Sequence, residues 1–96
     1  MKVREKIVEI YLREQIKKLN GIAYKFVSPG NAGVPDRLVL LPNGRTIFVE
    51  LKAPGKKTSV LQDRQIARIR KLGFQVEILD SVDKVDEFIE KMRGAI

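Results

Sequence analysis

The chain has 96 residues, 44% hydrophobic and 32% charged, which is enough for one compact domain and too few for two. It contains no cysteine and no histidine, which excludes disulfides, zinc fingers, thiol nucleophiles and any imidazole base. Lys and Arg number 19 against 12 Asp and Glu, and the net charge of +7 favours a polyanionic partner, although a merely well-hydrated surface also explains it. No apolar run approaches the ~18 residues of a membrane span, and Met1 leads straight into charged residues, so we expect no membrane partner and no signal peptide.

The first half of the chain predicts a helix, a strand and a loop. A helix over Val3–Leu19 ends at Asn20-Gly21, a common stop for helices. Ile22–Val27 contains β-branched and aromatic residues and predicts a strand. Ser28–Pro35 is too rich in glycine and proline for either regular element, so we expect a loop there.

A β-hairpin is predicted next. Two apolar runs, Leu38–Leu41 and Thr46–Leu51, are separated by Pro42-Asn43-Gly44-Arg45, and Asn-Gly between two such runs is a strong hairpin signal. Neither run alternates cleanly between apolar and polar residues, so we expect both strands to be covered on each face.

The rest of the chain predicts a helix, a strand and a final helix. Ser59 and Gln62 have the spacing of a capping box at the start of a helix that runs to about Leu72. Phe74–Leu79 alternates as a strand, and Ser81 begins a last helix whose apolar face is formed by Val85, Phe88, Ile89 and Met92. The connection through residues 59–72 is long enough to make the strands around it parallel, so the sequence predicts one α/β domain with a mixed sheet and helices on its faces.

Charged residues interrupt the second apolar run. Glu50 and Lys52 are two positions apart on the predicted strand, so their side chains leave the same face of the sheet. A plain ion pair at a sheet edge is one explanation. Asp36 favours a second explanation, a cation site, because the hairpin carries this carboxylate towards Glu50. Two carboxylates beside a lysine predict a site for Mg²⁺ or Mn²⁺, with Lys52 placed to stabilise charge that develops on a phosphodiester.

The predicted site depends on the register of the hairpin. A strict two-residue loop at Asn43-Gly44 would pair Asp36 with Leu51 and would place Asp36 on the face opposite Glu50. The site therefore requires an odd-length connection or a bulge between the two strands.

Two further residues have two explanations each. Glu5 continues the apolar stripe Val8, Leu12, Ile16 and Leu19 by one turn, so it is either a third carboxylate of the site or a favourable charge near the helix N-terminus. Glu9, at the edge of the same stripe, is the alternative helix carboxylate. Gln62 either closes the capping box or reaches the site.

These residues resemble a known family. Asp36 after Pro35, with Glu50-Leu51-Lys52 following a hairpin, resembles the PD-(D/E)XK nuclease superfamily. Longer strings resemble the VRR-NUC domain, namely Lys25-Phe26-Val27-Ser28-Pro29-Gly30, Gly33-Val34-Pro35-Asp36-Arg37, Phe48-Val49-Glu50-Leu51-Lys52-Ala53-Pro54-Gly55, and Ser59 with Gln62. The resemblance covers nearly the whole chain. It implies a single VRR-NUC domain over residues 1–96, with an αβββαβ restriction-endonuclease-like core followed by a C-terminal helix.

The resemblance also implies an activity and its residues. It implies an endodeoxyribonuclease, dependent on Mg²⁺ or Mn²⁺, that cuts branched DNA such as four-way (Holliday) junctions in the cytoplasm of a bacterial or phage-infected cell. Asp36 and Glu50 correspond to the metal ligands, joined by Glu5 and the backbone carbonyl of Leu51, while Lys52 and Gln62 complete the catalytic set. Expected nucleic-acid contacts are Lys25, Ser28, Arg37, Lys56, Lys57 and Arg64. The alternative is a non-catalytic nucleic-acid-binding protein on the same fold.

A homodimer is expected, since resolving a junction requires two cuts and a two-fold dimer supplies two equivalent sites. Ile7, Ile10 and Tyr11 lie on the first helix away from its main apolar stripe and form a candidate interface. A helix covered broadly by its own chain explains the same pattern.

Overall fold

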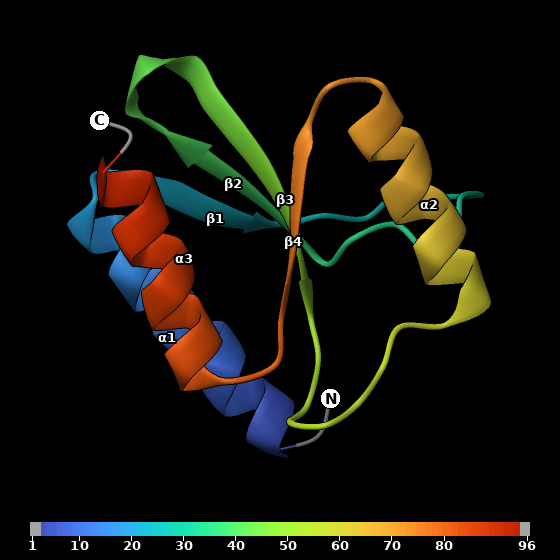
Figure 1. The fold of residues 1–96 in the computed structure, drawn as a ribbon, viewed down its shortest axis with the longest axis horizontal. Helices are drawn as coiled ribbons and strands as arrows, with labels where there is room; N and C mark the ends of the chain where they lie inside the picture. The colour runs from blue at the N-terminus through green and yellow to red at the C-terminus, as the bar shows by residue number, and fades with distance from the viewer. Residues whose placement is uncertain (1–2, 95–96) are drawn as a thin grey trace.

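The computed structural model describes residues 3–94, and it contains the predicted elements in the predicted order (Figure 1). The elements are α1 (Val3–Lys18), β1 (Ile22–Lys25), β2 (Arg37–Leu41), a 3₁₀ turn (Pro42–Gly44), β3 (Arg45–Leu51), α2 (Val60–Lys71), β4 (Gln75–Leu79) and α3 (Val82–Gly94). Within this part of the chain, no helix has both the length and the apolar composition of a membrane span.

The four strands form one mixed sheet in the order β1-β2-β3-β4. β1 and β2 are antiparallel, β2 and β3 are antiparallel, and β3 and β4 are parallel because α2 carries the chain back between them. Helices α1 and α3 lie side by side on one face of the sheet, and α2 lies on the other (Figure 1). The predicted α/β architecture with a mixed sheet is confirmed.

The helix ends follow the signals in the sequence. Asn20 adopts a left-handed φ of 63°, and the N–H of Gly21 donates to the carbonyl of Ile16 at 3.0 Å, which ends α1. A Cβ on Gly21 would lie 2.6 Å from the carbonyl oxygen of Leu40, so only glycine lets the chain turn this close to β2. At the start of α3, the Ser81 hydroxyl accepts from the N–H of Lys84 at 3.1 Å.

The hydrophobic core lies between the sheet and the pair α1 and α3. The predicted stripe of α1 is buried here at Val8, Leu12 and Ile16, with Leu19 packed at its margin. It meets the predicted face of α3 and the inward residues of the strands, namely Val85, Phe88, Ile89, Met92, Val39, Leu41, Ile47, Val49, Leu51 and Leu79. Both helices are therefore oriented by their apolar stripes.

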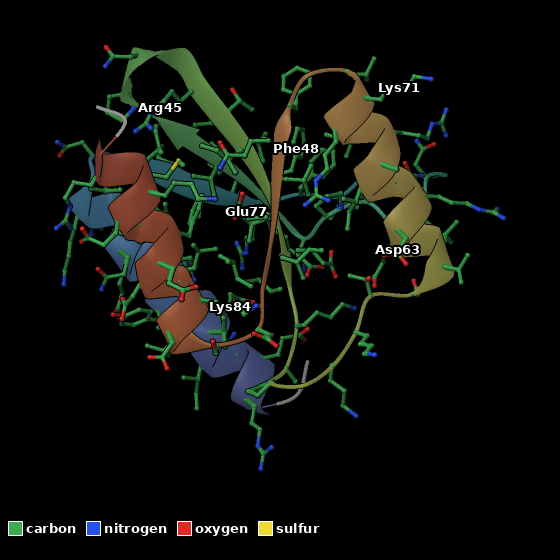
Figure 2. All side chains as sticks on the ribbon, in the orientation of Figure 1. Arg45, Phe48, Asp63, Lys71, Glu77 and Lys84 are labelled. Atoms are coloured by element: carbon green, nitrogen blue, oxygen red, sulfur yellow. The ribbon has the colours of Figure 1, made fainter. Side chains whose placement is uncertain are left out.

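The opposite face of the sheet is covered only in part, which differs from expectation. Phe48 lies on the α2 side of β3, whereas Glu77 of β4 lies on the α3 side (Figure 2). Phe48 packs edge-to-face against Phe26 and Phe74, with ring centroids 5.5 and 6.0 Å away. Leu40 of β2 is 37% exposed, so the prediction that both hairpin strands are covered on each face is wrong for β2. The physical reason is that α2 packs over β4 and leaves β1 and β2 open.

The hairpin between β2 and β3 has the odd length that the predicted site requires. Its connection is the three-residue 3₁₀ turn Pro42–Gly44, in which Asn43 and Gly44 adopt φ of 68° and 73°. The turn pairs Leu41 with Arg45 and Arg37 with Val49. One more step along this antiparallel register sets Asp36 opposite Glu50. Directly opposed residues of two paired strands project from the same face of the sheet. The two carboxylates therefore leave the same face of the sheet.

Candidate active site

Four of the predicted site residues meet where β2 begins and β3 ends. Asp36 immediately precedes β2, Glu50 and Lys52 are at the end of β3, and Gln62 is in the first turn of α2. In Figure 1 this end of β3 and the start of α1 lie at the same end of the molecule. The site is thus assembled from both strands of the hairpin and from the helix that follows.

Glu50 is the buried centre of this group, with only 1% of the residue exposed. Its Oε2 accepts a hydrogen bond from the Gln62 side-chain amide at 2.8 Å and lies 3.3 Å from the Lys52 ammonium. Its Oε1 is buried and has no hydrogen-bond partner among residues 3–94. A carboxylate in the central strand is therefore satisfied at one oxygen only, which is costly for a buried charge.

The surroundings of Glu50 raise its pKa to about 7 from an ordinary value of 4.5. Burial is the largest cause, and the negative charges of Asp36 and Glu5 raise the pKa further, whereas Lys52 lowers it through its charge and a hydrogen bond. The free carboxyl is therefore held near half ionisation at neutral pH, and a cation beside it would favour the ionised form.

Asp36 is tied to the neighbouring strand through the backbone of Leu51. Its Oδ2 accepts a hydrogen bond from the Leu51 N–H at 3.0 Å, which holds the carboxylate across the end of the hairpin. Leu51 thus takes part in the site through its N–H, and a ligand role for its carbonyl stays a prediction.

Gln62 combines the two roles that the sequence left open. Its Oε1 accepts from the N–H of Ser59 at 2.9 Å and its own N–H donates to the Ser59 hydroxyl at 3.1 Å, which completes the capping box. The Nε2 of the same amide donates to Glu50. One side chain therefore closes the start of α2 and bonds that helix to the buried carboxylate.

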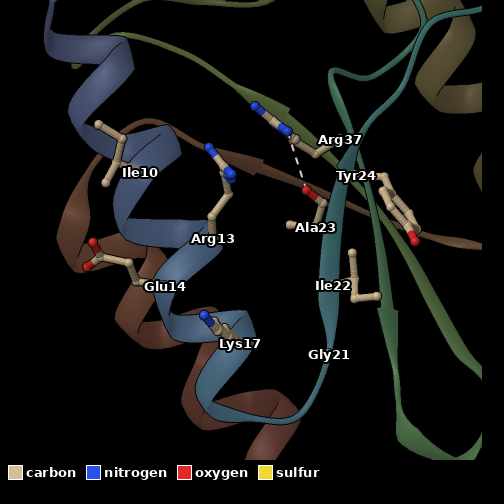
Figure 3. Close-up of a pocket in the computed structure, with 9 residues that line it drawn as sticks. All are labelled: Ile10, Arg13, Glu14, Lys17, Gly21, Ile22, Ala23, Tyr24 and Arg37. Carbon is tan, nitrogen blue, oxygen red and sulfur yellow. Dashed lines mark hydrogen bonds between the residues drawn. The ribbon is translucent and has the colours of Figure 1, made fainter.

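Glu5 and Glu9, both on α1, have different surroundings. The Oε1 of Glu9 lies 2.9 Å from Nη2 of Arg37, and Nη1 of Arg37 donates to the carbonyl of Ala23 at 3.3 Å (Figure 3). Glu5, half-buried, acts on Glu50 through its charge. The ion pair between Glu9 and Arg37 was not predicted from the sequence. The position of Glu9 at the edge of a buried stripe was a signal, because a buried carboxylate needs a cationic partner.

Five of the six residues expected to contact nucleic acid are accessible. Lys25, Lys56, Lys57 and Arg64 are exposed, and Ser28 is half-buried. Arg37 is only 8% exposed, because its guanidinium is engaged by Glu9 and Ala23. Its guanidinium is therefore already bound within the protein, beside the cavity that it helps to line.

A cavity of about 750 Å³ lies away from these carboxylates, between α1 and β1 (Figure 3). Arg13 and Lys17 line it from the helix, and Ile22 and Tyr24 from the strand, whereas Asp36, Glu50, Lys52 and Gln62 do not contribute. The site at the end of β3 is distinct from this cavity.

Asp36 and Glu50 offer oxygen atoms that fit a divalent cation. No group of three or more Asp, Glu, His or Cys side chains converges within residues 3–94, so Glu5 does not join Asp36 and Glu50 in a closed cluster. Two carboxylates on one face, one of them with a buried oxygen that has no partner in the described part of the chain, are hard oxygen donors of the kind that Mg²⁺ and Mn²⁺ prefer. These residues fit such a cation held partly by water.

The raised pKa of Glu50 predicts a pH-dependent stability of the metal-free protein. Between pH 4.5 and about 7 the folded state keeps a proton on Glu50 that the unfolded state releases, so stability falls as pH rises through this window. We expect Glu50→Gln to exceed the wild type in free energy of unfolding by about 1–3 kcal/mol at pH 8, and by less at pH 5. Urea unfolding in EDTA measures the free energy of unfolding of the wild type and of Glu50→Gln at each pH, and Glu90→Gln serves as the exposed control. Parallel pH profiles for the wild type and Glu50→Gln would contradict the burial argument.

A mixed sheet with an acid opposite a Glu-x-Lys strand end defines a nuclease core of the PD-(D/E)XK type. The VRR-NUC domain family matches residues 2–83, and the chain belongs to this family. A protein of Acyrthosiphon pisum secondary endosymbiont phage 1, "Putative nuclease p44", is 58% identical over 81 residues, which make up 84% of this chain and 87% of that protein.

Solved structures agree with this assignment. A structure described as a VRR-NUC domain is 37% identical, superposes with a TM-score of 0.88, and covers 93% of this chain and 97% of its own. A second, described as a VRR-NUC domain protein, has a TM-score of 0.66 at 18% identity over 94% of this chain and 88% of its own. The second likeness supports the fold alone.

Proposed function

We propose that this protein is a divalent-cation-dependent endonuclease that hydrolyses phosphodiester bonds in branched DNA. The observation that carries the proposal is the buried Glu50, whose Oε1 has no partner in residues 3–94 and whose face is shared with Asp36 and Lys52. Membership of the VRR-NUC family and the net charge of +7 support a nucleic-acid substrate.

Each residue of the site has a chemical role in this proposal. Asp36 and Glu50 hold Mg²⁺ or Mn²⁺, and Glu5 and the Leu51 carbonyl are the further candidate ligands. When bound, the cation supplies a water of lowered pKa and offsets charge on the phosphodiester. The side chain of Lys52 is 17% exposed, so its ammonium can reach a phosphate beside the carboxylates and stabilise the negative charge that develops there.

The double role of Gln62 predicts a separable effect on activity. Gln62→Ala removes the donor to Glu50 and half of the capping box, whereas Ser59→Ala weakens the same cap and leaves Gln62 in place. We expect each variant to lose about 1 kcal/mol of stability. Only Gln62→Ala should also lower the cleavage rate, by roughly tenfold, because Glu50 loses its orienting partner. Thermal unfolding and single-turnover cleavage measure the two effects, and equal rates in both variants would mean that Gln62 is only a cap.

A four-way junction is the substrate that we propose, cut by a symmetric homodimer. Ile7 and Ile10 on α1 are 53% and 42% exposed and support an interface on this helix. Tyr11 is instead engaged within its own chain, since its hydroxyl donates to Asp86 and its ring packs against the core. The phage origin of the relative supports the cytoplasm of an infected host cell as the place of action.

A substrate panel tests this function. The protein is mixed with labelled duplex, flap, splayed-arm and four-way-junction DNA, each with Mg²⁺, with Mn²⁺ or with EDTA. We expect cleavage of the junction on opposed strands with either metal, none in EDTA, and a dimer in sedimentation equilibrium at micromolar concentration. Binding without cleavage under every condition would favour the non-catalytic alternative, and a strict monomer that makes paired cuts would refute the dimer.

A further inference from the structure

The structure assigns a positioning role to the ion pair between Glu9 and Arg37, which we propose holds α1 and the start of β2 in the geometry needed for cation binding. The inference rests on the proposed function, and it concerns two residues that do not themselves touch the cation. Glu9, Arg37 and the carbonyl of Ala23 together form a clamp.

The clamp joins three elements. Arg37 is the first residue of β2, Glu9 lies in the middle of α1, and Ala23 is in β1. The guanidinium donates to the Ala23 carbonyl through Nη1 at 3.3 Å (Figure 3) and reaches Glu9 through Nη2 at 2.9 Å, so both arms of its planar fork are used. The helix and the two strands are therefore fixed to one another at a single point.

The clamp is adjacent in sequence to acidic residues of the site. Arg37 directly follows Asp36, and Glu9 lies about one helical turn after Glu5. Alternation along the strand sends Arg37 to the α1 side and Asp36 to the Glu50 side. Holding the residue after Asp36 against α1 thus fixes the strand end that presents Asp36 relative to the helix that carries Glu5.

Stability alone does not explain the clamp. The side chains of Glu9 and Arg37 are only 7% and 10% exposed, and a buried ion pair of this kind is often no more stable than well-packed apolar residues of similar size. Lys6 is 3.8 Å from Glu9 but is 58% exposed, so it contributes little. What apolar residues cannot supply is a directional link between a helix and a backbone carbonyl.

The test replaces the clamp by an apolar pair. In Glu9→Leu/Arg37→Met both charges are removed together, so no buried charge is left unpaired and the variant is expected to fold with a melting temperature near that of the wild type. We expect its Mn²⁺ affinity, measured by isothermal titration without DNA, to be weaker by about tenfold. The cleavage rate at saturating Mn²⁺ should fall by a similar factor or more.

Two further variants keep the result interpretable. Glu77→Leu/Lys91→Met removes a pair that links β4 to α3 at 3.4 Å on the face of the sheet opposite Glu50, and should leave Mn²⁺ affinity unchanged. Arg37→Lys keeps the charge but loses the fork, so its Mn²⁺ affinity should lie between those of the wild type and the apolar variant; this comparison stands even if the apolar variant fails to fold. Wild-type Mn²⁺ affinity in folded Glu9→Leu/Arg37→Met, or in Arg37→Lys, would overturn the positioning role. Absence of Mn²⁺ binding and of cleavage in the wild type would instead overturn the proposed function.

Discussion

Asp36→Asn, Glu50→Gln and Lys52→Met are each expected to lower kcat/KM for junction cleavage by at least ~10²-fold while leaving DNA affinity largely intact. The first two variants keep the shape of the side chain and remove the charge that a cation requires. The third removes the ammonium that lies 3.3 Å from Glu50. Single-turnover cleavage at saturating protein measures the loss, and a fluorescence-polarisation titration in Ca²⁺ measures the binding.

The stability prediction for Glu50 sharpens this test. Glu50→Gln should be at least as stable as the wild type at pH 8, so inactivity in that variant cannot be attributed to unfolding. Glu90→Gln, with the same chemical change on a side chain that is 71% exposed, serves as the matched control and should cleave at the wild-type rate. Full activity of Glu50→Gln would contradict the assignment of Glu50 as a ligand of the catalytic cation.

DNA affinity is expected to fall steeply with salt. Each phosphate contact to duplex DNA contributes about −0.9 to the slope of log K against log salt concentration. If Lys25, Lys56, Lys57 and Arg64 make one contact each, affinity should drop by ~10²-fold between about 50 and 200 mM salt. The junction and a duplex of unrelated sequence should show similar slopes, since phosphate contacts position a protein without specifying bases.

The chain has two pairs of consecutive, exposed lysines, Lys17-Lys18 and Lys56-Lys57. Replacing either pair removes the same amount of charge, so the two double variants can be compared directly. Lys56→Gln/Lys57→Gln alters the connection between β3 and α2, next to the site, whereas Lys17→Gln/Lys18→Gln alters the far end of α1. We expect the first double variant to reduce the salt slope by about 2 and the second to leave it nearly unchanged. Equal slopes in both variants would mean that net charge, and no particular surface, attracts the DNA.

The order of the elements and the helix boundaries could be predicted because their causes are local. The capping box of Ser59 and Gln62, the stop at Asn20-Gly21 and the stripe of Val8, Leu12 and Ile16 each depend on residues within a few positions of one another. The same holds for the pairing of Glu50 with Lys52, since alternation along one strand puts both on one face. The candidate carboxylates and lysine were therefore visible in the sequence.

The coverage of the sheet was not predictable in the same way. An apolar run such as Leu38–Leu41 has the same pattern whether or not a helix covers its second face. The position of α2 over β4 leaves Leu40 exposed, and that position depends on how the crossover packs as a whole. Long-range packing thus decided which apolar residues became core.

The sequence by itself determined which residues could form the site, and the tertiary structure decided which of them meet. Asp36 joins Glu50 only because the turn Pro42–Gly44 is three residues long, and the alternative register would have sent it to the other face. Arg37 was expected at the DNA surface but pairs with Glu9, because the packing of α1 on β1 brings an acid to it from 28 positions earlier in the chain. Contacts of this kind depend on side chains from separate elements that no local pattern relates, so they become visible only in the folded chain.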